Sequence, residues 1–81
     1  MARIEVRLYA ERMSSEEPLD LGLHTIKADY DITEAEALQV LKADKRLGYS
    51  ISGSVLEFAG AIIPLSDLKA LRVEIVSRYQ E

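Results

Sequence analysis

Apolar and polar residues alternate at the start of the chain with the period of two that is typical of a half-buried β-strand. The apolar positions are Ile4, Val6, Leu8 and Ala10. We therefore predict a strand over residues 3–12. A polar break at residues 14–18 ends in a proline, and a second alternating segment follows with leucine at positions 19, 21 and 23. This pattern predicts an antiparallel hairpin with a longish loop.

The second alternating segment changes its parity near its middle. After Thr25 the apolar positions shift to Ile26 and Ala28. Such a shift predicts either a bulge near His24 and Thr25 or the end of regular strand pairing.

Residues 31–48 carry the signals of one amphipathic α-helix. Thr33 and Glu36 have the spacing of a capping box, in which each side chain accepts a hydrogen bond from the backbone of the other residue. Gly48 supplies a helix stop. The apolar residues that share one stripe are Ala37, Leu38, Val40, Leu41 and Leu47. The helix is therefore expected to pack by one face only.

The chain returns to strand character after the helix. Residues 49–58 alternate, with a change of parity that predicts a bulge at Gly53 and Ser54. A short strand follows over residues 61–65, and residues 66–70 have room for one helical turn. Alternation over residues 71–79 predicts a last strand.

The predicted fold is α+β with the order β-β-α-β-β-β: an antiparallel sheet of about five strands with one helix on one face, in a single domain of residues 1–81. A helix is about 10 Å wide, whereas five strands span about 20 Å. One helix cannot cover such a sheet, so the sheet either curls or leaves an apolar strip open. We favour an open strip that a second copy of the chain covers, because small domains without disulfides or metals often gain stability by oligomerisation.

Composition narrows the possible functions. The chain of 81 residues is 48% hydrophobic and 30% charged, which is the composition of a folded domain. It has no cysteine and one histidine, so disulfide scaffolds, cysteine zinc sites and thiol nucleophiles are excluded. The net charge of −4 makes direct binding to nucleic acid unexpected. No apolar run approaches the ~18 residues of a membrane span and no secretion signal is recognisable, so we expect a cytoplasmic protein that does not bind membranes.

The residues with chemical potential have simpler interpretations. His24 falls on the strand parity opposite Leu21 and Leu23, which predicts an exposed strand residue. Asp20 on the same parity is ~13 Å away along an extended strand, too far to share a metal ion. The remaining carboxylate pairs are explained by helix capping and solvation. We therefore expect no enzymatic activity, no metal and no cofactor.

Interface chemistry is the leading interpretation. We expect a noncatalytic protein-interaction or regulatory module that binds a partner protein or a second copy through a sheet edge or the uncovered sheet face. Tyrosine and arginine are enriched in interface hot spots, although solvent-exposed cross-strand pairs would give the same pattern. The candidate interaction residues are Arg7, Tyr9, Glu16, Glu17, Asp20 and Tyr79.

Two alternatives from other classes stay open. The first is an acidic mimic of nucleic acid that inhibits a DNA- or RNA-binding partner, which requires the carboxylates to lie in one stripe. Those carboxylates belong to Glu11, Glu16, Glu17, Asp20, Asp29, Asp31, Glu34 and Glu36. The second is a small-ligand pocket between helix and sheet near Tyr30 and Tyr49, which requires an enclosed cavity with convergent polar groups.

Overall fold

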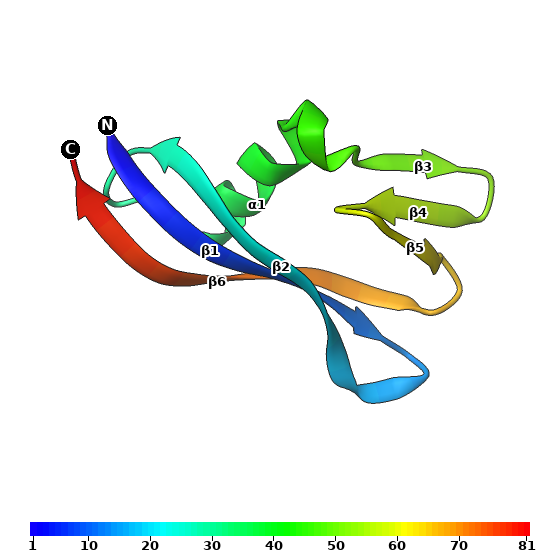
Figure 1. Ribbon diagram of the computed structural model, residues 1–81. Helices are drawn as coiled ribbons and strands as arrows, with labels where there is room; N and C mark the ends of the chain where they lie inside the picture. Colours follow the sequence, from blue (N-terminus) through cyan, green and yellow to red (C-terminus); the bar gives the residue numbers. More distant parts are fainter.

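The computed structural model describes residues 1–81 and shows an α+β protein with six strands in two antiparallel three-stranded sheets (Figure 1). The elements are β1 (Ala2–Arg12), β2 (Ser15–Ala28), α1 (Glu34–Ala43), the short 3-10 helix η1 (Lys45–Leu47), β3 (Ser50–Ser52), β4 (Val55–Phe58), β5 (Ala61–Pro64) and β6 (Leu68–Gln80). The order β-β-α-β-β-β-β confirms the predicted class. It differs from the expectation by one additional strand and by the division of the strands into two sheets.

One turn explains the additional strand. Gly53 has a φ of 59° and begins a two-residue turn between the paired residues Ser52 and Val55. The predicted bulge at Gly53 is therefore a hairpin, because glycine adopts positive φ without steric cost. The predicted helical turn at residues 66–70 is also wrong, since β6 begins at Leu68.

β1 is the central strand of the larger sheet, which has the order β2-β1-β6. Its inward side chains have no exposed surface; they are Ala2, Ile4, Val6, Leu8 and Ala10. The alternation in the first segment thus gives the predicted half-buried strand. The pairing of β1 with β6 places Arg7 opposite Glu74 and Arg3 opposite Tyr79.

The smaller sheet has the order β3-β4-β5 and, together with α1, buries the inner face of β1. Leu56, Phe58 and Ile63 are at most 2% exposed and join the same core as the inner face of β1 and α1. Figure 1 shows this small sheet extending beyond the end of α1 that is farther from the termini. The apolar strip that we expected to stay open is therefore covered within one chain.

The β1–β2 connection is tighter than predicted. β1 ends at Arg12 and β2 begins at Ser15, so Pro18 lies within a strand and not in a loop. The Asp67 carboxylate accepts hydrogen bonds from the Ser14 backbone N–H at 2.7 Å and from its hydroxyl at 2.8 Å. These bonds fix the hairpin end of the larger sheet to the turn that precedes β6.

A bulge in β2 resolves the change of parity, but it lies earlier than predicted. Leu21 and Gly22 together face Leu8 of β1, and Gly22 has a φ of 101°. The bulge turns Leu23 outward, with 48% of its surface exposed, and turns His24 toward the covered face, where it is half-buried. The predictions of an inward Leu23 and an exposed His24 are therefore wrong.

The loop before α1 is held by β6. The Arg78 guanidinium donates hydrogen bonds to the carbonyl oxygens of Tyr30 and Ile32. Glu34, in the first turn of α1, accepts a hydrogen bond from the Ile75 backbone N–H at 3.2 Å. Both contacts draw the start of α1 toward β6, and α1 consequently packs much more closely on β6 than on β2.

The predicted capping box is present at the start of α1. The Glu36 backbone N–H donates to the Thr33 hydroxyl at 3.2 Å, and the Thr33 backbone N–H donates to the Glu36 carboxylate at 3.0 Å. Hydrogen bonds from the Thr33 backbone and hydroxyl hold the pKa of Glu36 below its usual value. α1 begins at Glu34, and the predicted helix divides at Asp44 into α1 and η1.

The lowered pKa of Glu36 gives a pH-dependent contribution to stability. Because the folded state favours the ionised form, the contribution is complete above the usual glutamate pKa and is lost as the pH falls through the lowered folded pKa. We expect the difference in Tm between the wild type and Glu36→Gln to be constant near pH 7 and to change only in the acid range. Thermal unfolding followed by circular dichroism between pH 3 and pH 7 measures it. A difference that is independent of pH would show that the carboxylate charge adds nothing to the cap.

Candidate functional site

Three of the six candidate interaction residues meet on the outer face of the larger sheet. Arg7 of β1 and Asp20 of β2 form an ion pair at 3.0 Å, and Tyr9 lies directly opposite Asp20 in the strand register. Glu16 and Glu17 are exposed near the hairpin end of β2. Tyr79 lies at the opposite end of the sheet, and the structure does not bring the six residues into one patch.

The charges of this outer face are mostly paired within the chain. Arg72 and Glu11 approach to 3.8 Å, and the Ser77 hydroxyl donates to the Glu5 carboxylate at 2.9 Å. The Arg3 guanidinium lies 4.7 Å from the centre of the Tyr79 ring. A partner that docked on this face would have to replace these contacts. Its role in binding stays a prediction, and the geometry favours another surface.

The carboxylates considered for nucleic-acid mimicry fall into two groups. Glu11, Glu16, Glu17 and Asp20 are on β1 and β2 toward the hairpin end of the sheet. The other four lie beyond the opposite end of β2, between residues 29 and 36. Asp20 and Asp29 are nine positions apart, a separation of about 30 Å along an extended strand. This distribution does not give the single stripe that mimicry requires.

The two tyrosines of the small-ligand hypothesis lie at opposite ends of α1. Tyr30 precedes the helix, and its carbonyl is bound by Arg78. Tyr49 follows η1, and its ring packs edge-on against Phe58 with the ring centres 5.1 Å apart. Lys42 lies 5.2 Å from the centre of the Tyr49 ring. Tyr49 is thus engaged in packing, and no shared pocket between the two rings is formed.

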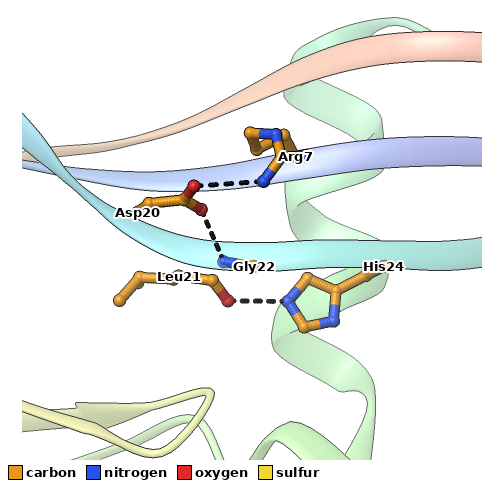
Figure 2. A network of polar contacts seen from close by, with 5 residues as sticks. All are labelled: Arg7, Asp20, Leu21, Gly22 and His24. Carbon is orange, nitrogen blue, oxygen red and sulfur yellow. Dashed lines mark hydrogen bonds and ion pairs between the residues drawn. The ribbon is translucent and has the colours of Figure 1, made fainter.

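Side chains form hydrogen bonds with the polar backbone groups at the β2 bulge (Figure 2). The Asp20 carboxylate bridges the Arg7 guanidinium and the Gly22 backbone N–H, at 3.0 Å and 2.8 Å. The His24 ring nitrogen Nε2 lies 2.9 Å from the Leu21 carbonyl oxygen. Figure 2 shows Leu21 and His24 on the side of β2 away from β1. The edge of β2 is therefore closed at the bulge by its own side chains.

Beyond the bulge, residues 23–28 of β2 form a free sheet edge. β2 pairs with β1 only, and a strand paired on one side directs every second backbone N–H and C=O away from the sheet. No hydrogen bond outside the regular helices and strands uses a backbone group of these residues. The opposite edge of the sheet, at β6, is partly occupied, because the Ile75 backbone N–H donates a hydrogen bond to Glu34.

A groove runs between this free edge and α1. Three adjoining hollows of about 420, 650 and 310 Å³ line it. The first two share Lys27 and Val40, and the last two share Thr25, Asp44 and Arg46. The groove lies where α1 packs closer to β6 than to β2. The inward side chains of β2 below it are themselves buried. Sequence reasoning considered a sheet edge but did not identify β2. Pro18 was an available signal, since proline within a strand marks an edge.

The groove has exposed apolar side chains in its middle. Its middle is lined by Val40, which is 37% exposed, by Ala43, and by Ile26, which is only 5% exposed. The remaining residues of the middle are Thr25, Lys27, Asp44 and Arg46. At the η1 end, Arg46 donates a hydrogen bond to Asp44 at 2.8 Å. The side-chain and backbone hydrogen bonds from Arg46 lower the pKa of Asp44, so this end carries a closed ion pair.

The groove presents backbone hydrogen-bonding groups and apolar side chains. No group of three or more His, Asp or Glu side chains gathers closely enough to hold a metal ion. No helix is long and apolar enough to cross a membrane. Comparison with protein-family models, curated proteins and solved structures finds no match, so the function is inferred from the geometry of this chain alone.

Proposed function

We propose that this protein is a noncatalytic protein-interaction module that binds an extended segment of a partner along the free edge of β2. The observation that supports the proposal is the coincidence of unpaired edge backbone at residues 23–28 with the groove beside α1. A bound segment would add a fourth strand to the larger sheet, and main-chain hydrogen bonds would supply much of the affinity. Alternate side chains of the segment would point into the groove and supply specificity.

Self-association is not required to bury the apolar face of the sheet. The inner face of β1 is buried by α1 and the smaller sheet, so a second copy is not needed to cover it. A second copy could still use the free edge of β2, and its binding is an alternative outcome of the test below. The outer face around Arg7 and Tyr9 is the competing surface for a partner protein.

Substitution of Val40 by lysine should weaken binding of an extended peptide at least about tenfold. The apolar Val40 side chain lines the middle of the groove, and loss of one buried aliphatic contact costs about 1.5–3 kcal/mol. Lysine at this exposed helix position would lie one turn from both Glu36 and Asp44, which favours the helix. The probe is a peptide selected on the wild type from a displayed library of random seven-residue sequences, and fluorescence polarisation measures its Kd.

Gln39→Lys is the matched control, because Gln39 is exposed on the same helix and lines neither of the hollows that Val40 lines. It adds the same charge and should leave the Kd unchanged. Amide exchange by nuclear magnetic resonance locates the peptide: protection is expected within residues 23–28. Protection or shift changes confined to Arg7 and Tyr9 would instead assign binding to the outer face and contradict the proposal.

A further inference from the structure

The groove is unevenly charged along its length. Its end beside the start of α1 is lined by three acids, Asp29, Asp31 and Glu36, by one basic side chain, Lys27, and by Met1. The other end is lined by Asp44 and Arg46, which pair with each other. The groove therefore changes from an acidic end, through a middle where the apolar Val40 and Ala43 are exposed, to an end where the charges are paired with each other.

Helix capping explains only part of the acidic end. Glu36 is engaged with Thr33 in the capping box. The carboxylates of Asp29 and Asp31 take part in none of the ion pairs of the chain, whose acidic members are Asp20, Asp44 and Glu11. Both residues are exposed. Two carboxylates at the end of an open groove are thus free to pair with a ligand.

The free edge limits the length and form of that ligand. Residues 23–28 span about 20 Å at the usual strand rise, so a partner strand of six or seven residues matches them. Side chains of this strand that face the groove recur at every second position. Those in the middle would meet the exposed Val40 and Ala43, and one at the end would reach Asp29 and Asp31.

We propose that the partner segment is an extended cationic peptide with apolar residues at alternate positions and lysine or arginine at the end that meets Asp29 and Asp31. The inference rests on the proposed function of the β2 edge. Charge complementarity favours such a segment over a second copy, because this chain carries a net charge of −4. Opposite charge at one end also fixes the direction in which the segment runs along β2.

The double variant Asp29→Lys/Asp31→Lys tests the charge of the partner. Peptides are selected from the random seven-residue library on the wild type and, separately, on the double variant. We expect wild-type peptides to be enriched in lysine or arginine at one terminal position and to bind the double variant at least about tenfold more weakly at 0.15 M salt. Peptides selected on the double variant should instead carry glutamate or aspartate at that position.

Glu16→Lys/Glu17→Lys is the matched control, since it makes the same change of charge at exposed positions near the other end of β2. It should change the Kd less than about threefold, because the site lies more than a Debye length from the groove's acidic end. Equal weakening by both double variants would show a response to net charge and would overturn the inference.

The remaining outcomes separate the inference from the proposed function. Peptides that depend on Val40 but bind the Asp29→Lys/Asp31→Lys variant unchanged would overturn the cationic partner and leave binding at the β2 edge standing. If none of the selected peptides binds the Val40→Lys variant more weakly than the wild type, both the cationic partner and binding at the β2 edge are overturned. Sedimentation that shows a wild-type dimer, dissociated by Val40→Lys, would identify a second copy as the occupant and also overturn the cationic partner.

Discussion

Replacement of Phe58 by alanine should lower the free energy of unfolding by about 3–5 kcal/mol, the usual cost of deleting a buried phenylalanine ring. Phe58 is 1% exposed and is the largest fully buried side chain of the protein. Its ring also packs edge-on against Tyr49. Since domains are stable by only about 5–15 kcal/mol, the variant should be partly unfolded near 37 °C. Urea unfolding followed by circular dichroism measures the change.

Ile62→Ala is the control for this prediction, because Ile62 lies in the neighbouring strand of the same small sheet but is 68% exposed. Its effect should stay within about 0.5 kcal/mol, as is usual for surface substitutions. Equal midpoints for the two variants would mean that the small sheet does not pack on β1. In that case the inner face would be open, and the original reason for a homodimer would return.

Replacement of Gly22 by asparagine should cost about 1–3 kcal/mol, the range for a residue forced into a rarely populated backbone conformation. Gly22 has a φ of 101°, and a β-carbon there would lie 3.4 Å from His24 Nε2. The positive φ thus strains the backbone of the bulge, and the β-carbon would come into van der Waals contact with the His24 ring. Thermal unfolding measures the loss of stability. The peptide-binding assay shows whether the side chains of residues 23–28 still face the same sides of the sheet.

Gly53→Asn provides the comparison. Gly53 has a φ of 59°, and nothing lies within 4 Å of a β-carbon placed there. Asparagine tolerates this left-handed conformation, so the variant should keep nearly the wild-type Tm. If Gly22→Asn proved equally mild, the bulge would not depend on glycine, and the strain that we assign to this position would be absent.

Local chemistry made parts of this fold predictable. The strand β1 was predictable because its alternation depends only on which side chains avoid water. The inward face of β1 is wholly buried, and β1 is the central strand of its sheet. The Thr33 and Glu36 capping box needs only residues three apart in sequence. Periodicity also identified Ala37 and Leu41, which are buried on α1.

The errors arise where a glycine permits two geometries. The apolar parity changes after Gly22 and again across Gly53. A change of parity fits a bulged strand and a hairpin equally well, so the pattern alone does not distinguish them. At Gly22 the strand continues because β1 is long enough to pair on both sides of the bulge. At Gly53 the chain reverses, and β3 pairs with β4. In both cases the choice depends on the partner strand.

The sequence by itself determined the α+β class, the helix with its cap and the acidic, cysteine-free chemistry, because these follow from composition and from contacts between near neighbours. Only the tertiary structure decided that β2 is an edge strand, that α1 leans toward β6 and that the small sheet closes the core. Those features depend on pairing between residues distant in sequence, and an edge strand can carry the same alternation as a strand paired on both sides. The candidate groove is a product of this packing, so its residues could not be grouped before the fold was known.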